Sequence, residues 1–528
     1  MKEFFGQKGY LEILEKRVSG LTAGYRQNLA IIGDELVGKT SLLFNFLQYL
    51  HNNRIIPVYL EVRPESQELF CRRFIGALLY NFLLNSGLEL REDLDYLLKK
   101  AQNYIPNTAN KIKHILQMLS SRKKSCVFSE LFGLCELIHE ETSKSCLIIL
   151  DEFHNLETLG FGNLYREWCK LLILQKNTMY IIVSSLKFKT KSILSKNLSL
   201  LFGNFELINV EPFDIKTSLG YLNQRLHTFE LEEGLKNFII HFTGGFPLYL
   251  EVISEELLKS PSESLAQIIE DELFQSSGTL HQRFSNYLKR FTDSPRSQEF
   301  ISILHMVACG HNRTREIASI LHKTKREVTA RLNRLLELDT ITKSGDFLKI
   351  NDRVFGFWLR FVYQEKMRSL TFDARNQQNI FKQHIVGMIE EFQSDARKSL
   401  SERVAQVAQL FEDETLQIEK KRIRLSHFRE IKPLEFNRRN LKEGLLCRSK
   451  DSLWIMAFKP DGLSEEDVAD FAKECRKYRH KRQSKILVSL KDIETNARLR
   501  AMEEKILTWD LDNLNHIFDL FSKPRVIA

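Results

Sequence analysis

The sequence predicts an α/β protein built around a parallel, doubly wound sheet, with further helical and α/β parts after it. Three observations predict this class. An apolar run, Leu29–Ile32, leads through a glycine-containing loop into an amphipathic helix. A second apolar run, Cys146–Leu150, ends in two acids. Further runs of strand length are separated by helical periodicity, which is the pattern of βαβ units.

Composition sets the scale of the molecule. The chain has 528 residues, and a length of this order predicts about three or four domains. Hydrophobic residues make up 43% of it and supply several cores, while 27% charged residues with few prolines and glycines argue against long disordered segments. The net charge of +9 allows contact with nucleic acid without requiring it.

Cysteine spacing and hydropathy bear on the compartment. The eight cysteines form no C-x-x-C pair, and no histidine lies at ligand spacing from one, so we expect reduced, buried thiols and no zinc site. The first residues lack the apolar core of a signal peptide, and no apolar run is long enough to predict a membrane span. The sequence therefore predicts a soluble, cytoplasmic protein.

The loop after the first strand carries the most specific motif. Residues 33–40 match G-x-x-x-x-G-K-[ST], the pattern of a phosphate-binding P-loop. Its two glycines let backbone N–H groups point at phosphate oxygens. Lys39 adds a cation for the β- and γ-phosphates, and the Thr40 hydroxyl can ligate Mg²⁺. The pattern can arise by chance, but here a strand precedes it and an amphipathic helix follows. The predicted ATP-binding residues are Gly33, Asp34, Glu35, Leu36, Val37, Gly38, Lys39, Thr40 and Ser41.

Two acids follow a later strand. After a strand at Ile55–Val62 and helical patterns from about residue 65 to 141, the apolar run at 145–150 leads into Asp151 and Glu152. Many strands end in acids for solubility alone. Behind a P-loop, however, Asp151 is expected to hold Mg²⁺ and Glu152 to polarise the attacking water as a general base.

Two more strands complete the predicted sheet. The run Met179–Ser185 ends in hydroxyl residues, and we predict Ser185 as a sensor of the γ-phosphate, although serines also end strands as ordinary turn formers. A further strand is predicted at Phe205–Val210. We expect an additional strand between the P-loop strand and the strand that ends at Asp151.

Together these motifs resemble the archaeal-type ATPase family, a branch of the AAA+/STAND P-loop ATPases related to origin-recognition initiators. The segment Phe242–Leu250 is similar to that family's G-G-x-P motif in a helical lid. The resemblance implies that Gly244 and Gly245 approach the nucleotide and that Pro247 opens the next helix; a plain glycine cap between two helices is the alternative. The family's arginine in its N-terminal element is replaced here by Gln7, and no arginine finger can be placed. Both departures concern hydrolysis rather than binding.

A winged helix-turn-helix is predicted next. Helical periodicity covers Ser297–Cys309, Thr314–Leu321 and Lys325–Leu338, and a hairpin with its turn at residues 344–345 spans Ile341–Ile350. In a DNA-binding winged helix the third helix enters the major groove. The basic residues expected to meet DNA phosphates are Lys325, Arg326, Arg331 and Arg334. The alternative is a packing module whose basic residues are simply solvated.

The last part of the sequence is predicted to form a compact α/β unit. A strand at Ser452–Lys459, a helix at Glu465–Tyr478 and a strand at Lys485–Leu490 follow a basic stretch at about 420–450. In the resembled family this region is often similar to a PD-(D/E)xK nuclease. Such a site needs an acid two residues before its lysine, and here Ala457 precedes Lys459. We therefore expect a nuclease-like fold without cleavage activity. The basic residues at 476–482 are most simply a solvated helix end.

These expectations define four domains and one leading function. The predicted boundaries are a P-loop ATPase core at 1–212, a helical lid at 213–285, a winged helix at 286–365 and a C-terminal α/β domain at 366–528. The leading hypothesis is an ATP-binding and ATP-hydrolysing switch of AAA+/STAND type that uses Mg²⁺ and acts on DNA, a protein partner or a second copy of itself. Lys39, Glu152 and Ser185 are the expected catalytic residues. The alternatives are an ATP-gated nuclease and a nucleotide-bound scaffold with little turnover.

Overall fold

The computed structural model describes residues 5–84, 90–120, 127–199, 205–292, 297–363, 373–418, 421–436, 441–478 and 482–527. The chain divides into two compact units. The first unit comprises Met1–Phe213 with Phe246–Leu248 and Glu337–Asp339. The second comprises Asp214–Gly245, Tyr249–Leu336 and Thr340–Ala528.

The first unit is built on a five-stranded sheet in which all neighbouring strands are parallel. Its order is β2-β3-β4-β1-β5, so β4 lies between the P-loop strand β1 and the strand β3 that ends at Asp151. The predicted fold class and the additional strand are therefore confirmed. The strands are β1 (Asn28–Ile32), β2 (Ile55–Glu61), β3 (Ser145–Asp151), β4 (Thr178–Ser184) and β5 (Phe205–Asn209).

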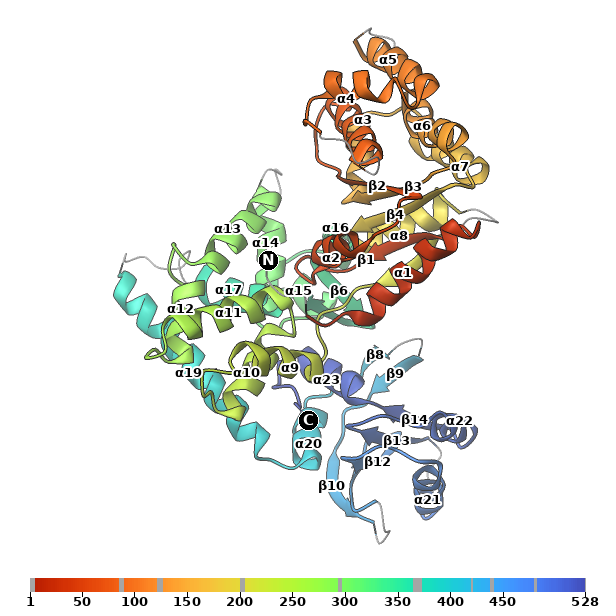
Figure 1. Cartoon of the computed structure of the whole chain (residues 1–528). Coiled ribbons are helices and arrows are strands. Elements are labelled where there is room, and N and C mark those ends of the chain that lie inside the picture. The colour runs from red at the N-terminus through yellow and green to blue at the C-terminus, as the bar shows by residue number, and fades with distance from the viewer. Residues whose placement is uncertain are drawn as a thin grey trace. The chain divides into compact units, whose positions relative to one another are not determined.

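The central strands of this sheet are buried along their whole length. Every residue of β1, β3 and β4 is buried, as expected for a parallel sheet covered by its crossover helices. Helices α3 to α6 gather beside the β2 edge (Figure 1). The helices are α1 (Lys8–Thr22), α2 (Lys39–Tyr49), α3 (Gln67–Leu84), α4 (Leu94–Ala101), α5 (Pro106–Ser120), α6 (Val127–Thr142), the 3-10 helix η1 (Phe153–Leu159), α7 (Leu164–Leu174) and α8 (Lys187–Lys196).

The second unit begins with helices and a small hairpin. Three helices and the hairpin follow the order expected for a winged helix: α14 (Ser297–Ala308), α15 (Thr314–Ile320), α16 (Lys325–Glu337), β6 (Ile341–Ser344) and β7 (Phe347–Ile350). The other helices here are α9 (Ile215–Arg225), α10 (Glu233–Thr243), α11 (Pro247–Lys259), α12 (Leu265–Leu273), α13 (Thr279–Thr292), α17 (Arg353–Trp358), the π-helical η2 (Leu359–Tyr363), α19 (Ala374–Ala396) and α20 (Leu400–Ala408).

A second five-stranded sheet, of order β10-β11-β12-β13-β14, lies near the C-terminus. Its first pairs are antiparallel, and β12, β13 and β14 are parallel. The stretch at 420–450, which the sequence left without assigned structure, contributes three strands. The elements are β8 (Glu414–Ile418), β9 (Lys421–Leu425), β10 (Glu430–Glu435), β11 (Glu443–Arg448), β12 (Leu453–Lys459), α21 (Glu465–Cys475), β13 (Gln483–Ser489), α22 (Thr495–Glu503), β14 (Ile506–Trp509) and α23 (Leu511–Leu520).

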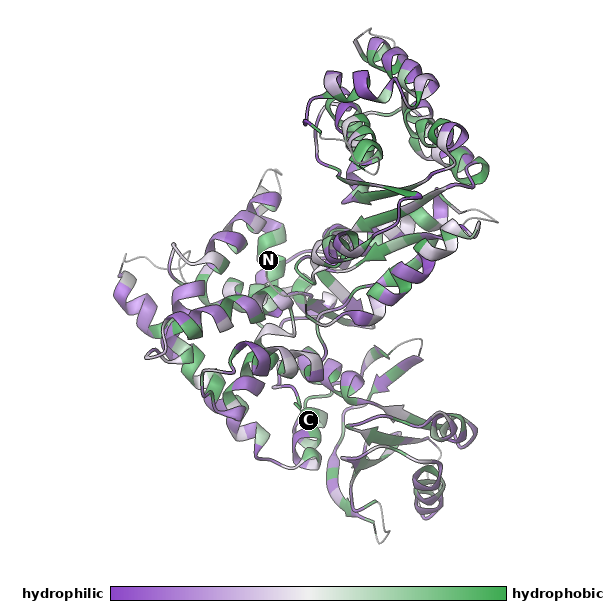
Figure 2. Cartoon of the chain, viewed as in Figure 1, coloured by the Kyte–Doolittle hydropathy of each residue, from purple (hydrophilic) through white to green (hydrophobic). Residues whose placement is uncertain are grey.

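Both faces of the C-terminal sheet are covered by apolar clusters. One cluster joins its strands to α20, α23 and the β8–β9 hairpin, and the other joins them to α21 and α22. Hydrophobic residues accordingly line the strands of both large sheets (Figure 2). Among the described residues, no helix is long and apolar enough to cross a membrane. The seven cysteines described form no disulfide, and five of them are buried; Cys126 lies outside the described residues.

Candidate functional site

The P-loop connects the end of β1 to the start of α2, and two glycines fix its path. A Cβ atom on Gly33 would meet the carbonyl oxygen of Val210 at 2.3 Å, so no larger residue fits beside the end of β5. Gly38 has φ 91° and forms the N-cap of α2. Leu36 also has a positive φ, 72°, which is uncommon for a residue with a side chain. The loop therefore has the sharply curved backbone that the motif predicts.

Lys39 lies inside this loop. Its Nζ donates hydrogen bonds to the carbonyl oxygens of Gly33 at 2.9 Å and Asp34 at 2.7 Å, and only 6% of the residue is exposed. Burial lowers the pKa of Lys39, and the nearby acids, Glu152 first among them, oppose that shift. The ammonium group is thus held by two neutral carbonyl oxygens. A charged phosphate oxygen would form a stronger hydrogen bond with it.

The two residues predicted to bind Mg²⁺, Thr40 and Asp151, are in direct contact. Thr40 Oγ1 donates to Asp151 Oδ2 at 2.9 Å, and the Tyr59 hydroxyl donates to the same oxygen at 2.9 Å. The backbone N–H of Glu152 donates to Asp151 Oδ1 at 2.9 Å. A hydroxyl and a carboxylate so close together are hard oxygen donors of the kind that Mg²⁺ prefers, which fits the predicted ion.

Glu152 is turned toward β4 by its own backbone. It has φ 49°, in the left-handed region, just after β3 ends. Its Oε2 accepts hydrogen bonds from the Ser185 N–H at 3.2 Å and from Ser185 Oγ at 2.9 Å. Burial raises the pKa of Glu152, although Ser185 and Lys39 oppose that shift. The predicted base and the predicted sensor therefore contact each other at the carboxyl ends of β3 and β4.

His154, to which the sequence assigned no role, belongs to the same cluster. Its Nδ1 lies 3.2 Å from Glu152 Oε2 and 2.9 Å from Ser184 Oγ. Burial, with the charge of Lys189 next in size, lowers the pKa of His154 to about 4, so the ring is neutral at physiological pH. Its position two residues after Glu152 was the only indication in the sequence that His154 lies at the site. A single histidine in a loop does not by itself predict a functional role.

Three further residues lie at the site, and sequence reasoning assigned none of them a role there. Tyr59 projects from β2 onto Asp151, as described above. Gln7 donates from Nε2 to the carbonyl oxygen of Val37 at 2.8 Å, so this residue contacts the P-loop. Lys187, the first residue of α8, forms an ion pair with Asp34 at 2.7 Å. Tyr59 and Lys187 lie in no recognisable motif, because strand register and helix packing bring them to the loop. Gln7 lies in the N-terminal element noted above, where it stands only as a departure from the resembled family.

The predicted lid residues lie at a helix–helix junction. Gly244 ends α10 in the left-handed conformation with φ 65°, and Gly245 follows with φ 79°. Pro247 is the first residue of α11. The local geometry fits both the lid motif and the glycine-cap alternative, so an approach of these glycines to the nucleotide stays a prediction.

The basic residues predicted for DNA contact differ in their surroundings. Lys325, Arg326 and Arg334 are exposed on α16. Arg331 is not, because its guanidinium forms an ion pair with Glu299 of α14. The turn of the β6–β7 hairpin is also engaged: Ser344 Oγ donates to the carbonyl oxygen of Gln417 at 2.6 Å, on strand β8.

The position expected for a nuclease acid is apolar. Ala457 is fully buried in the apolar cluster that packs against α21 and α22. Lys459 forms an ion pair with Asp467 of α21, whose side chain is completely buried. Glu402 is used in a capping box with Ser399 at the start of α20. Within the described ranges, no group of three or more His, Cys, Asp or Glu side chains is placed to hold a metal ion.

Comparisons with known proteins concern the fold. No protein-family model matches the chain, and no curated protein matches its sequence. A Walker-type ATPase of Pyrococcus abyssi is similar in structure with a TM-score of 0.50 and 19% identity, over 67% of this chain and 96% of that chain. The ORC2 protein of Aeropyrum pernix, in its ADPNP–ADP complexes, gives a TM-score of 0.40 and 11% identity, over 74% and 98%.

The first of these likenesses fits the geometry of the site. A five-stranded parallel sheet, a P-loop after its first strand and an acid pair after its third define the fold of the P-loop ATPases. At 19% identity the similarity to the Pyrococcus abyssi protein shows this fold alone. What the site does therefore rests on this chain's own residues.

Proposed function

We propose that this protein binds ATP with Mg²⁺ at the P-loop and hydrolyses it. The observation that carries the proposal is the hydrogen bond of 2.9 Å between Thr40 and Asp151, formed beside the curved loop that holds Lys39. The two proposed Mg²⁺ ligands come from different elements, Thr40 from α2 and Asp151 from β3. They meet where the P-loop would present the β- and γ-phosphates. The similar fold of a Walker-type ATPase supports the same proposal.

Binding uses the loop and its lysine. The backbone N–H groups of residues 33–41 and the start of α2 would cradle the phosphates. Lys39 would exchange the carbonyl oxygens of Gly33 and Asp34 for phosphate oxygens, which form stronger charge-assisted bonds. Thr40 and Asp151 would hold the Mg²⁺ ion, which neutralises phosphate charge when bound.

Hydrolysis uses the acid that faces β4. Glu152 would take a proton from the attacking water, and its raised pKa brings it closer to the range in which a base works well at neutral pH. Ser185 holds the Glu152 carboxylate through two hydrogen bonds. A γ-phosphate that bound the Ser185 hydroxyl would release this carboxylate toward water, which gives Ser185 the sensing role proposed for it.

A regulatory role requires that the nucleotide state reach the rest of the chain. Within the second unit, Asp519 of α23 supports such transmission. Its buried carboxylate binds Lys349 of β7 at 2.5 Å, Arg525 at 2.7 Å and Arg353 of α17. The backbone N–H of Arg525 donates to His241 Nδ1 on α10 at 3.1 Å. The predicted lid, the hairpin and the C-terminal domain are thus tied together, so movement of one would move the others.

The proposed partner of the switch is DNA or another protein. Exposed Lys325, Arg326 and Arg334 on α16 support contact with DNA phosphates. The nuclease alternative gains no support, because Ala457 is buried among apolar side chains and Lys459 is paired with Asp467. The scaffold alternative differs from the switch only in its rate of ATP hydrolysis, which phosphate release by the wild-type protein would measure.

The decisive experiment is the substitution Lys39→Ala in the full chain. Calorimetric titration with ATP and Mg²⁺ should show binding by the wild-type protein and none by the variant, because the loop loses its only motif cation. Lys16→Ala, which removes an exposed lysine of α1, is the matched control and should bind as the wild type does. Unchanged affinity in Lys39→Ala would disprove the site. Tight ATP retention without phosphate release by the wild type would favour the scaffold.

A further inference from the structure

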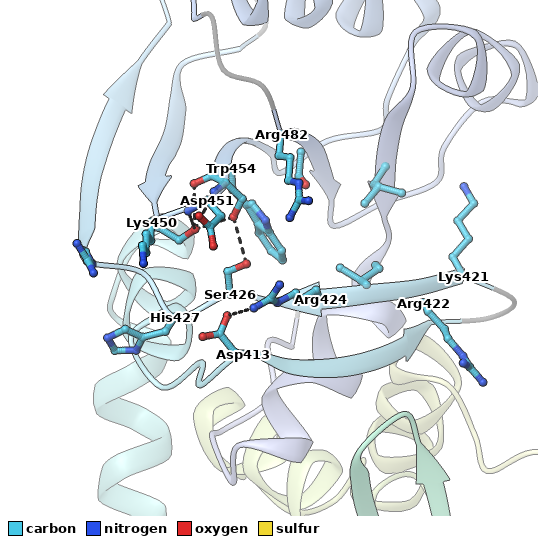
Figure 3. A pocket seen from close by; sticks show the side chains of 16 residues that line it. Asp413, Lys421, Arg422, Arg424, Ser426, His427, Lys450, Asp451, Trp454 and Arg482 are labelled. Carbon is cyan, nitrogen blue, oxygen red and sulfur yellow. Dashed lines mark hydrogen bonds and ion pairs between the residues drawn. The ribbon is translucent and has the colours of Figure 1, made fainter.

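A cavity of about 630 Å³ opens in the C-terminal domain (Figure 3). It lies between the β8–β9 hairpin, the β11–β12 turn and the first residues of β12 and β13. Strand β12 runs from Leu453 to Lys459, and the cavity includes Trp454 near its start. The cavity is therefore at the opposite end of the strand from Lys459, where a nuclease site would have been.

The lining of this cavity is strongly cationic. Six of its sixteen residues are Lys or Arg and two are Asp. One of the acids, Asp413, forms an ion pair with Arg424 at 3.0 Å, and both side chains are at least half exposed. Among the described residues, Arg422, Arg429 and Lys450 form no ion pair, and all three are exposed. The cavity therefore has an excess of positive charge that the domain does not neutralise.

Hydroxyl groups line the floor between these cations. Ser452 Oγ donates to Ser426 Oγ at 3.1 Å, and it lies 2.8 Å from Ser449 Oγ. The two sides of this cluster come from the end of β9 and from the β11–β12 turn, so the fold assembles it from distant segments. Figure 3 shows Arg424 and Arg482 on opposite sides of Trp454, which is itself 2% exposed. The serine hydroxyls of the floor are thus bonded to one another across the two segments.

We propose that this cavity binds successive phosphates of a nucleic-acid strand. Arginine forks match the oxygens of a phosphate in a bidentate manner. Arg422 and Arg424 are two residues and so about 7 Å apart along β9. That separation is too long for one phosphate group and suits a chain of them. Figure 3 shows Arg422 directed away from Trp454, at the outer side of the hairpin, so the cations extend from the cavity over its rim. The cavity volume also exceeds what a single phosphate fills.

This site is separate from the winged helix and from ATP. The hairpin turn that a winged helix can direct at DNA is bound to β8, where the Asp346 N–H donates to the Thr415 carbonyl oxygen at 2.8 Å and the Thr415 N–H returns a bond to Asp346 Oδ2 at 2.8 Å. The cavity beside the β8–β9 hairpin is a different surface, and its Arg422, Arg429 and Lys450 form no ion pair with a described residue. The proposal does not depend on nucleotide binding at the P-loop.

The test compares two double variants of the full chain with equal loss of charge. Arg424→Gln with Lys450→Gln removes two cavity cations, and Lys442→Gln with Lys505→Gln removes two exposed cations of the same domain outside the cavity. Fluorescence anisotropy with a labelled single strand of about 20 nucleotides gives the affinity at several salt concentrations. The cavity variant should bind at least about tenfold more weakly, with the slope of log K against log salt reduced by about 1.4, because each lost contact with a single strand contributes about 0.7.

Three results would overturn the proposal. The first is the absence of binding by the wild-type chain. The second is a cavity variant that binds as the wild type does, and the third is a control variant that loses as much affinity as the cavity variant. Competition by polyglutamate as effective as that by unlabelled oligonucleotide would assign the cavity to acidic proteins instead. A charge-preserving variant, Arg424→Lys with Lys450→Arg, should keep the affinity within a few fold and excludes misfolding as the cause. ATP affinity, measured in parallel, should be equal in all variants.

Discussion

Asp151 at the end of β3 and Asp519 in α23 are both buried, and their carboxylates are bound by different kinds of partner. Asp519 is bound by three cations, Lys349, Arg353 and Arg525. Among the described residues, the hydrogen-bond partners of Asp151 are instead the hydroxyls of Thr40 and Tyr59 and a backbone N–H. One carboxylate is bound by cations of the protein, and the other is bound by neutral donors.

This difference separates a structural acid from a ligand-binding acid. Burial alone would raise the pKa of Asp519, but the charges of Arg353, Arg525 and Lys349 overcome it and hold that pKa well below its usual value. At Glu152, burial prevails over Ser185 and Lys39, and the pKa is raised. A carboxylate without a fixed counter-ion is costly to bury, and a bound cation or a reaction that uses its basicity gives a reason to retain it.

The largest effect is expected for Glu152→Gln. The amide keeps the size of the side chain but cannot accept a proton, so kcat for ATP hydrolysis should fall by about 10²–10⁴-fold while ATP affinity changes little. Phosphate release and calorimetric titration measure the two quantities. Glu140→Gln, at an exposed position of α6, is the control and should leave both unchanged. A variant that still turns over at the wild-type rate would remove Glu152 from the role of base.

Asp519→Asn tests the structural side of the comparison. Three partly buried cations would lose their buried counter-ion, and the free energy of unfolding of the second unit should fall by about 3–5 kcal/mol. Asp470→Asn, which breaks an exposed pair with Lys473, should cost at most about 1 kcal/mol. Because the folded pKa is depressed, the Asp519 contribution is complete above about pH 4 and declines as the pH falls below it. Denaturation curves at neutral and acidic pH check both statements, and equal losses in the two variants would contradict them.

Tyr59→Phe tests whether Asp151 is positioned for a metal. Loss of the donated hydrogen bond should leave the fold intact and raise by about tenfold the Mg²⁺ concentration needed for half-maximal turnover, as is usual for the partners of metal ligands. The control is Tyr49→Phe, which alters a tyrosine that is 65% exposed on α2. An unchanged Mg²⁺ requirement would show that the tyrosine serves only packing.

The smallest expected effect is a displaced acid limb in the pH dependence of kcat. Glu152 must be ionised to accept a proton, and its raised pKa means that activity is lost at a higher pH than the usual glutamate value of about 4.3. His154 does not produce this limb, because its pKa of about 4 keeps it neutral over the same range. The limb should therefore persist in His154→Gln. A wild-type kcat that stays constant down to about pH 4.5 would contradict the assignment.

Local patterns in the sequence were enough for much of the first unit. The P-loop, the acid pair and the positions of the strands along the chain could be predicted, because each depends on residues close together in the chain. The helices of the winged-helix region and the strand–helix–strand at the C-terminus were found for the same reason. The strands at 421–448 were missed, because alternating basic residues such as Arg422 and Arg424 conceal the apolar face formed by Ile423 and Leu425.

By itself the sequence determined the type of site: Gly33, Gly38, Lys39 and Thr40 specify a P-loop through spacing alone. Only the tertiary structure decided which partners surround it, since Tyr59, Ser185 and Asp151 come from three different strands and meet through sheet register. The structure likewise decided that Asp519 is neutralised and that the cations around Trp454 form a cavity. Spacing along the chain can encode a loop's geometry, whereas the charge balance of a buried group depends on segments that only folding brings together.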